Sequence, residues 1–498
     1  MNQRTQAKIV ATLGPASESL DVIRALIEAG ADVLRVNFSH GGPDDHRRLA
    51  RAVRTVAGEM DREVALLGDV AGPRLRCGQI SPEPVQLEAG RQVTLTTEAV
   101  VGSESLIPVN YGHLHEDVRP GQEIALDDGR IRLQVEAIEG RRIVCRIVEG
   151  GPLRSHKGLN LPETTLQIAA ITDDDRRSIA VAVEEGFDFL GLSFVASAAD
   201  VAMARTIVQQ GGGAIALIAK IERRSAVEQL EEILDAADGA MVARGDLGVE
   251  LPLERVPLVQ KRVIRACNAR AKPVITATQM LESMIHSHRP TRAEVADIAN
   301  AVLDGTDAVM LSGETAVGEF PVEAVRAMDR VAKAADEALD RENYLRRDAA
   351  ALPSDNDSAM GQAASQLAFD LKTDAIVCLT EGGSTARRIA RHRPLCPILA
   401  VTTNLATARR LLLSWGVEPI FLPAMTNLPP PAAASTAGGD RHDQSQIGSW
   451  INRMLQLCVR AGRLQPGQRV VIVAGLPLGR PGITNLIHLA TVPPANET

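Results

Sequence analysis

Short apolar segments alternate with longer amphipathic segments along residues 8–340, which is the pattern of β-strands followed by helices around a parallel sheet. Eight apolar segments are short enough to be buried strands: residues 8–13, 32–38, 64–69, 187–194, 214–221, 239–243, 273–277 and 307–311. Helical patterns follow them, as at residues 173–185, where Thr172 is a candidate cap. Eight such units predict a (β/α)8 TIM barrel.

A long interval separates the third predicted strand from the fourth. Most of it alternates Val, Ile, Leu and Arg, with glycine turns at Gly90, Gly121, Gly129 and Gly140. This pattern predicts a small β-barrel domain inserted into the larger barrel. The barrel would then comprise residues 1–72 and 157–340, and the inserted domain residues 73–156.

The strand and helix pattern starts again after residue 340 and predicts a separate open α/β domain over residues 341–498. We expect a helix at 358–370 and strands at 375–379, 398–401, 418–422, 470–473 and 486–490. Residues 424–449 are rich in Pro, Ala, Ser and Gly and lack periodicity, so a surface loop without an assigned function is expected there.

Composition and charge exclude several classes of protein. A formal net charge of −8 argues against a nucleic-acid-binding protein. The six cysteines form no C-x-x-C pair, and no segment has the length and apolarity of a membrane span. We therefore expect a cytoplasmic protein without a nucleic-acid or membrane partner.

Polar residues follow seven of the eight predicted barrel strands, at the rim where such barrels bind ligands. These residues are Arg35, Asn37, Ser39, His40, Asp69, Ser193, Lys220, Glu222, Arg244, Gly245, Asp246, Thr278, Gln279, Ser312, Gly313 and Glu314. A single charged residue at a strand end is usually only solvated, but this convergence indicates a site.

Glu222 and Asp246 end adjacent strands and could bind one hard divalent cation. Alternatively, each carboxylate could pair with a neighbouring arginine, Arg223 or Arg244. Lys220 lies on the same side of its strand as Glu222, where its ammonium group suits a transferring phosphoryl group or an enolate; the alternative is a salt bridge to Glu222.

Gly245 would let backbone amides approach a substrate carboxylate, and Thr278 offers a hydroxyl for proton transfer or is merely a strand-end hydroxyl. Together these residues predict phosphoryl-transfer or enolate chemistry on a small acid.

Several motifs resemble those of pyruvate kinases, and the similarity extends from Lys8 to the C-terminus. They are R-V-N-F-S-H-G from Arg35, A-K-I-E from Ala219, M-V-A-R-G-D-L-G-V-E from Met241, A-T-Q-M-L-E-S-M from Ala277, P-T-R-A-E-V-A-D-I-A-N-A-V from Pro290, M-L-S-G-E-T-A from Met310, H-K-G-L-N-L-P from His156 and G-I-T-N from Gly482. The resemblance implies transfer of the phosphoryl group of phosphoenolpyruvate to ADP, giving pyruvate and ATP, in a homotetramer.

The resemblance also implies roles for individual residues. Glu222 and Asp246 would bind Mg²⁺ or Mn²⁺, Lys220 would stabilise the phosphoryl group and the enolate, Arg35 would hold the phosphate, and Thr278 would lie near the protonated carbon. Asn37, His40 and Arg76 resemble nucleotide-binding positions, and the β insert resembles a lid that excludes water. Asn37, Ser39, Asp69 and Val70 correspond to a potassium site.

The sequence departs from the family pattern beside that potassium site. Many members read D-T-K-G-P-E-I-R where this chain reads D-V-A-G-P-R-L-R from Asp69, so Arg74 replaces an acid. Our hypothesis is that the Arg74 guanidinium supplies the charge of potassium, and that K⁺ is not required.

A turn in the C-terminal domain could hold the phosphate of an allosteric effector, as the family does in this region. It contains Thr380, Gly382, Gly383, Ser384 and Thr385. Glu381 and the absence of lysine argue against a bisphosphate and leave a sugar monophosphate or AMP as candidates. A short Gly-Ser turn of this kind is equally often only a turn.

Two other functions remain open. A magnesium-enolate lyase or aldolase would share the carboxylate pair but would not need the lid or Arg35 with Asn37. A non-catalytic metabolite sensor would be expected to lack Lys220 or a metal ligand, and all are present.

Overall fold

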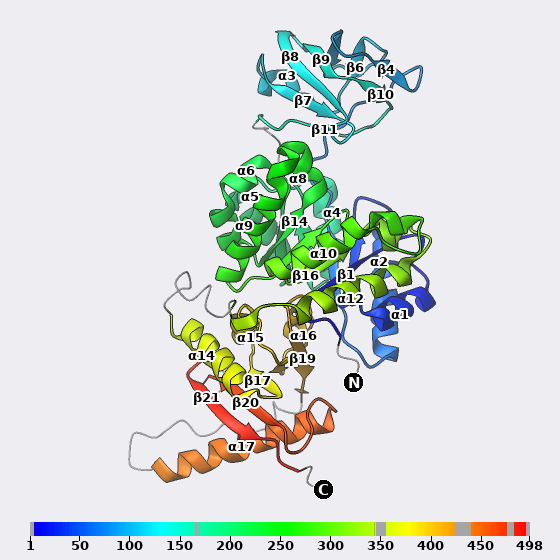
Figure 1. Cartoon of the computed structure of the whole chain (residues 1–498). Coiled ribbons are helices and arrows are strands. Elements are labelled where there is room, and N and C mark those ends of the chain that lie inside the picture. The colour runs from blue at the N-terminus through cyan, green and yellow to red at the C-terminus, as the bar shows by residue number, and fades with distance from the viewer. Residues whose placement is uncertain are drawn as a thin grey trace.

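The computed structural model describes residues 4–164, 168, 170–342, 344, 355–423, 440–475 and 483–494, with no side chains described for 440–447. Three parts follow one another along an elongated molecule (Figure 1). The inserted β part lies at one end, the barrel in the middle and the C-terminal part at the other end. The site predicted at the barrel rim therefore faces the insert.

Eight parallel strands form the predicted closed barrel, in the order β1-β16-β15-β14-β13-β12-β3-β2. Their bounds are Lys8–Leu13 (β1), Val33–Asn37 (β2), Ala65–Asp69 (β3), Phe189–Leu192 (β12), Ala216–Ile221 (β13), Gly239–Ala243 (β14), Val274–Ala277 (β15) and Ala308–Leu311 (β16). The fold class and all eight strands predicted from the apolar pattern are confirmed. Most strand residues are buried on both faces, which explains why these segments read as continuous apolar runs.

Helices cover the outside of the barrel (Figure 1). They are α1 (Leu20–Ala29), α2 (Pro43–Glu59), α4 (Asp173–Glu184), α5 (Ala198–Gln210), α6 (Arg224–Glu228), α7 (Leu230–Ala236), α8 (Arg244–Glu250), α9 (Val256–Ala269), α10 (Arg292–Asp304), α11 (Gly313–Ala316) and α12 (Pro321–Glu337), with 3-10 turns at Leu253–Arg255 and Glu282–Ile285. The predicted cap is present, because the Thr172 hydroxyl accepts a hydrogen bond from the Asp175 amide at 3.1 Å.

The insert is a β structure with its own buried core, as predicted. Its six-stranded sheet has the order β11-β7-β8-β9-β5-β6, and β10 pairs with β4. The elements are β4 (Val85–Leu87), β5 (Gln92–Thr96), β6 (Leu106–Pro108), α3 (Leu114–Asp117), β7 (Glu123–Leu126), β8 (Ile131–Glu139), β9 (Arg142–Glu149), β10 (Gly151–Leu153) and β11 (Leu159–Asn160). Because β11 pairs with β7, this sheet continues past residue 156; the domain limits given above stay predictions.

The C-terminal part is an open sheet of order β19-β18-β17-β20-β21, in which only the β20 and β21 pair is antiparallel. Its elements are α14 (Asn356–Leu371), β17 (Ala375–Leu379), α15 (Ser384–Ala390), β18 (Ile398–Thr402), α16 (Leu405–Leu411), β19 (Val417–Phe421), α17 (Asp440–Arg460), β20 (Arg469–Ala474) and β21 (Leu486–Thr491). The loop predicted at 424–449 is wrong from residue 440 onward, where α17 begins, and residues 424–439 lie outside the described residues. No described helix has the length and apolarity to span a bilayer.

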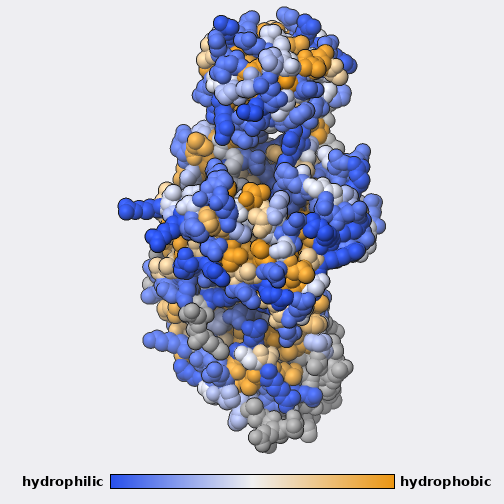
Figure 2. All heavy atoms as spheres, turned by 90° about the vertical axis from the view of Figure 1, so that its right-hand side faces the viewer, coloured by the Kyte–Doolittle hydropathy of each residue, from blue (hydrophilic) through white to orange (hydrophobic). Residues whose placement is uncertain are grey.

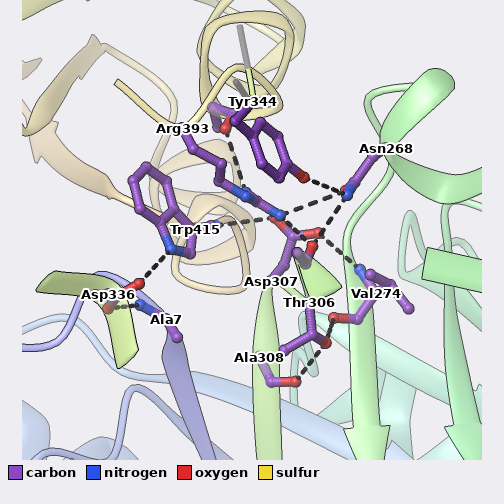
Figure 3. Close-up of polar contacts among 12 residues, drawn as sticks. Ala7, Asn268, Val274, Thr306, Asp307, Ala308, Asp336, Tyr344, Arg393 and Trp415 are labelled. Carbon is purple, nitrogen blue, oxygen red and sulfur yellow. Dashed lines mark hydrogen bonds and ion pairs between the residues drawn. The ribbon is translucent and has the colours of Figure 1, made fainter. Parts of the chain in front are cut away.

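A buried polar network joins the C-terminal part to the amino-terminal end of the barrel (Figure 3). Nη1 of Arg393 lies 3.0 Å from Oδ1 of Asp307, just before β16, and the guanidinium lies 5.0 Å from the centre of the Trp415 ring. Trp415 donates through Nε1 to Asp336 at 3.0 Å, and Asp336 also accepts from the amide of Ala7 at 3.1 Å. The C-terminal part is therefore fixed to the barrel end that lies opposite the predicted site.

Candidate functional site

A large cavity lies between the barrel rim and the insert. Its volume is about 950 Å³, and Lys220, Glu222, Asp246, Arg74 and Arg76 all contribute to its wall. In the space-filling view the insert meets the barrel at a hollowed neck where hydrophilic residues gather (Figure 2). A polar cavity of this size accommodates a nucleotide together with a small acid.

Lys220 is at the centre of a buried ionic cluster at the end of β13. Its Nζ donates to the Ser193 hydroxyl at 2.7 Å and lies 2.8 Å from Oε1 of Glu222 and 3.4 Å from Oδ1 of Asp69. Burial alone would lower the pKa of Lys220, but the charges of Asp69 and Glu222 outweigh it and raise that pKa. Lys220 is therefore a fixed cation, and the salt bridge to Glu222 that the sequence left as an alternative is present.

The carboxylate of Glu222 is deeply buried. Its Oε2 accepts from the Phe194 amide at 2.5 Å, and its Oε1 lies 2.8 Å from the Lys220 ammonium. Burial, with a further contribution from the negative charge of Asp246, raises the pKa of Glu222 to about 7 although Lys220 opposes this. A nearby positive charge would therefore strongly stabilise the ionised form of this carboxylate.

Asp246 lies in the first turn of α8 and faces the same cavity. Burial raises the pKa of Asp246, and the positive charges of Lys220 and Arg74 offset this only in part. Arg244, the alternative partner of Asp246, pairs instead with Asp297 at 2.7 Å. Arg223 lies over the Phe194 ring at 5.3 Å and forms no ion pair with Glu222.

Two carboxylates that line one cavity and raise each other's need for positive charge, Glu222 and Asp246, fit a hard divalent cation. No group of three His, Cys, Asp or Glu side chains suitable for a metal occurs within the described part of the chain. A cation here would take its remaining ligands from water and substrate, as Mg²⁺ commonly does.

Arg35 does not line the cavity. Its Nε donates to Oδ2 of Asp69 at 2.8 Å and its Nη1 to the Thr12 hydroxyl at 3.0 Å. Since Asp69 also contacts Lys220, Arg35 belongs to the same buried ionic cluster. The two cations outweigh the effect of burial and hold the pKa of Asp69 below its ordinary value.

Thr278 and Gly245 contact each other beside the cavity without lining it. The Gly245 amide donates to Oγ1 of Thr278 at 2.9 Å, and that hydroxyl donates to the Ala277 carbonyl at 2.6 Å. Thr278 has a φ of +68°, an uncommon conformation for a threonine. In this structure Thr278 accepts the hydrogen of the Gly245 amide, and the approach of backbone amides to a substrate carboxylate at Gly245 stays a prediction.

The residues of the potassium-type site lie near one another but outside the cavity wall. The Ser39 amide donates to Oδ1 of Asn37 at 3.2 Å, and the Ser193 hydroxyl donates to the Val70 carbonyl at 2.7 Å. Asp69 is already paired with Arg35. Several oxygens of this set thus have hydrogen-bond donors within the protein.

Of the predicted nucleotide-binding residues, Arg76 lines the cavity and His40 does not. Arg76 is exposed on the cavity wall, where its amide donates to Oδ1 of Asn110 at 2.8 Å. His40 is exposed and does not line the cavity; its carbonyl accepts from Nε2 of His46 at 2.8 Å.

Several cavity residues were not predicted from the sequence. The insert contributes Asp127 and Asp128 and the barrel contributes Arg224 and Glu250. Asp127 and Asp128 have φ values of +50° and +57° before Gly129, and Asp127 pairs with Lys157 at 2.7 Å. The D-D-G turn was visible in the sequence, but nothing there indicated that it faces the barrel.

Only some residues of the predicted effector turn line a cavity. Gly382 and Ser384 line a second cavity, whereas the Thr385 hydroxyl forms a hydrogen bond with that of Thr484 at 3.2 Å and Thr380 is buried. Gly383 has a φ of +80°, which favours glycine.

Comparisons with known proteins cover both the barrel and the C-terminal part. The family model "Pyruvate kinase, barrel domain" matches residues 4–325, and "Pyruvate kinase, alpha/beta domain" matches residues 358–490. A pyruvate kinase of Geobacillus stearothermophilus is 41% identical over 98% of this chain and 81% of its own length; one of Mycobacterium intracellulare is 42% identical over 97% and 98%. The crystal structure of a pyruvate kinase from Cryptosporidium parvum has a TM-score of 0.89 at 34% identity, covering 98% of this chain and 96% of that one.

Proposed function

The chain belongs to the pyruvate kinase family, and from this premise we propose how its own residues transfer the phosphoryl group of phosphoenolpyruvate to ADP. This reaction is the last step of glycolysis. The observation that carries the proposal is the buried cluster of Lys220, Glu222, Asp69 and Ser193 on the wall of a cavity shared with Asp246.

The family requires a divalent metal ion, and we propose Mg²⁺, or Mn²⁺, as the ion held by Glu222 and Asp246. When bound, the ion neutralises charge on the phosphoryl and enolate oxygens. The raised pKa of Glu222 means that the carboxyl group is partly protonated at neutral pH and must lose this proton to bind the ion.

Lys220 is the proposed catalytic cation. During transfer the bond between the phosphorus and the enolate oxygen of phosphoenolpyruvate breaks, and a bond forms to a β-phosphate oxygen of ADP. Negative charge then develops on the enolate oxygen. A cation already fixed by Ser193, Asp69 and Glu222 stabilises this charge without reorganisation.

Arg35 would assist phosphoryl transfer from a position beside the cavity wall. Its pairing with Asp69 holds the guanidinium in place and balances the charge of that carboxylate, which supports a role in holding the phosphate when substrate is bound. Thr278 is the proposed member of a proton path to the carbon of enolpyruvate. Its hydrogen bonds to Gly245 and Ala277 fix its hydroxyl beside α8.

The nucleotide would lie towards the insert. Arg76 on the cavity wall supports this placement, with Asn37 and His40 as further candidates nearer the barrel. The insert would then close over the substrates as a lid and exclude water, which would otherwise accept the phosphoryl group.

Potassium is proposed to be unnecessary. Arg74 lines the cavity near Asp246, and no described carboxylate forms an ion pair with it. Its guanidinium is thus available to supply positive charge in place of the monovalent ion attributed to Asn37, Ser39, Asp69 and Val70.

Two broader features complete the proposal. A cytoplasmic location and a homotetramer are proposed from the family resemblance alone. The turn that contains Thr380, Gly382, Gly383, Ser384 and Thr385 is proposed to bind a phosphorylated effector, since Gly382 and Ser384 line a cavity.

A coupled assay tests the function directly. Pyruvate formed from phosphoenolpyruvate is reduced by lactate dehydrogenase, and the oxidation of NADH is followed. The rate must depend on ADP and on a divalent cation; consumption of phosphoenolpyruvate without ADP would indicate a lyase instead.

A further inference from the structure

The chain crosses between the barrel and the insert twice. It leaves the barrel after β3 and returns to it before α4 (Figure 1). Both connections contribute to the wall of the large cavity, through Pro73 and Arg74 on the outgoing connection and Ile168 and Ala170 on the returning one. Since the insert can move over the substrates only about these connections, their attachment to the barrel decides how it closes.

One buried carboxylate holds both connections. Asp175 lies in the first turn of α4, and only 1% of it is exposed. Its Oδ1 accepts from the amide of Gly72, on the outgoing connection, at 3.1 Å. Its Oδ2 accepts from Thr172, at the end of the returning connection, through the amide at 2.9 Å and the hydroxyl at 2.7 Å. A single side chain therefore ties the two connections to each other.

Helix capping explains only one of the two carboxylate oxygens. Thr172 and Asp175 form a capping box at the beginning of α4, and Oδ2 makes the hydrogen bonds of Asp175 to Thr172. The bond from Gly72 to Oδ1 is not part of a capping box, because it joins residues 103 positions apart in the sequence. Oδ1 thus has a separate role.

The hydrogen bonds of Asp175 are suited to hold the connections firmly. Bonds to an ionised carboxylate are about twice as strong as those between neutral groups. The positive end of the α4 dipole stabilises the charge of a carboxylate in the first turn. Because Asp175 is buried, breaking one of these bonds would leave an oxygen without a donor, which is unfavourable.

Gly72 brings the outgoing connection against the end of β12. It has a φ of +65°, and a Cβ at this position would lie 3.0 Å from the carbonyl oxygen of Ser193. Two residues earlier, the Val70 amide donates to the Gly191 carbonyl at 3.0 Å, and the Val70 carbonyl accepts from the Ser193 hydroxyl at 2.7 Å. The connection therefore packs closely beside the residues that end this strand.

This packing links Asp175 to the proposed catalytic cation. The Ser193 hydroxyl, which donates to Val70, accepts from the Lys220 ammonium at 2.7 Å. Beyond Gly72 the same connection leads to Arg74 on the cavity wall. A shift of the outgoing connection would therefore disturb both the hydroxyl that holds Lys220 and the position of Arg74.

We propose that Asp175 is a positioning residue for phosphoryl transfer, which clamps the two connections together and provides the pivot about which the insert closes. Asp175 does not line the cavity, so it acts through Gly72 and Thr172. The proposal rests on the proposed function, in which the insert closes over the substrates. Without the clamp the insert would close less completely, and kcat would fall more than KM for phosphoenolpyruvate rises.

The lactate dehydrogenase-coupled assay of two full-length variants tests the proposal. D175A removes both halves of the clamp, and we expect it to lower kcat about tenfold or more. The matched control is T172A, which removes the hydroxyl of the same capping box but keeps the backbone amides of Gly72 and residue 172 as donors to Asp175. Its kcat should stay within about twofold of the wild type.

Hydrogen exchange measured on the same proteins tests the clamp without relying on activity. The Gly72 amide should exchange at least about tenfold faster in D175A than in the wild type or T172A, because its acceptor is lost. A wild type without ADP-dependent turnover would refute the proposed function, whereas the exchange rates would still report on the clamp.

Two results would overturn the proposal. One is an equal kcat in D175A and T172A, which would reduce Asp175 to a helix cap. The other is unchanged exchange at Gly72 in D175A. If D175A does not fold, the same comparisons are made with D175N, whose single side-chain oxygen can serve only one of the two connections.

Discussion

Nη1 of Arg393 lies 3.0 Å from Oδ1 of Asp307, and this fully buried ion pair joins the C-terminal part to the residue that precedes the last barrel strand. The same Oδ1 accepts from the Trp415 amide at 3.2 Å, and Oδ2 accepts from the Val274 amide at 3.1 Å. The Asp307 carboxylate thus binds groups of both the C-terminal part and the barrel (Figure 3).

The first prediction concerns this ion pair. R393M leaves the Asp307 charge buried without its cation. We therefore expect the free energy of unfolding of the parts that this pair joins, the barrel and the C-terminal part, to fall by about 3–5 kcal/mol. Calorimetric unfolding measures the loss. In the control R47M, which removes a partly exposed arginine paired with Asp44 and Glu184, the loss should stay below about 1 kcal/mol. Equal effects in the two variants would show that the buried pair has no special role.

The second prediction is a pH dependence at the neighbouring histidine. Burial and the charges of Arg391 and Arg393 lower the pKa of His392 from 6.5 to about 3. The unfolded chain therefore binds a proton below pH 6.5 that the folded chain does not bind, so stability falls as the pH drops from 6.5 towards 3.

At pH 5 this effect amounts to about 2 kcal/mol relative to pH 7.5. Replacing His392 by Gln removes the titrating group, so the H392Q variant should lose about that much less stability over the same interval. Unfolding measured at both pH values gives the difference. Identical pH dependence in the two proteins would contradict the assigned pKa.

The third prediction concerns Ser193 as a positioning residue for Lys220. Its hydroxyl accepts from Lys220 and donates to the Val70 carbonyl, both at 2.7 Å. S193A should lower kcat about tenfold or more with a smaller change in KM for phosphoenolpyruvate, because the ammonium is less well held in the transition state. S193T retains a hydroxyl and should recover part of kcat, whereas a purely structural role would make both variants unstable without this recovery.

The fourth prediction concerns the monovalent cation. In tetramethylammonium buffer the wild type should be activated less than about tenfold by added K⁺, because Arg74 already supplies positive charge beside Asp246. R74E should require K⁺, with R154Q, an exposed arginine of the insert outside the cavity, as the control. Activation of the wild type by about tenfold or more would refute the hypothesis.

Much of the fold could be predicted because each barrel strand is buried on both faces and so reads as a short apolar run. The residues at the strand ends could be assigned to one rim for the same reason. Lys220 lies on β13 and Glu222 directly follows that strand, and this spacing of two positions predicted that both side chains lie on one side.

Contacts between parts distant in sequence could not be predicted. Nothing local indicates that Asp69 pairs with Arg35, or that Thr278 accepts the Gly245 hydrogen, because both contacts depend on how strands close into a ring. The beginning of α17 at Asp440 was missed because its first residues are polar and follow a long Pro- and Ala-rich stretch.

The central claim is that the Lys220 ammonium stabilises the transferring phosphoryl group and the enolate. The lactate dehydrogenase-coupled assay of K220M, with Mg²⁺ and saturating ADP, tests it most directly, and K333M, which replaces a lysine of α12, serves as the control. We predict that K220M loses about three orders of magnitude or more in kcat while its unfolding profile shows a folded protein. Near-normal turnover of phosphoenolpyruvate and ADP by folded K220M would contradict the account.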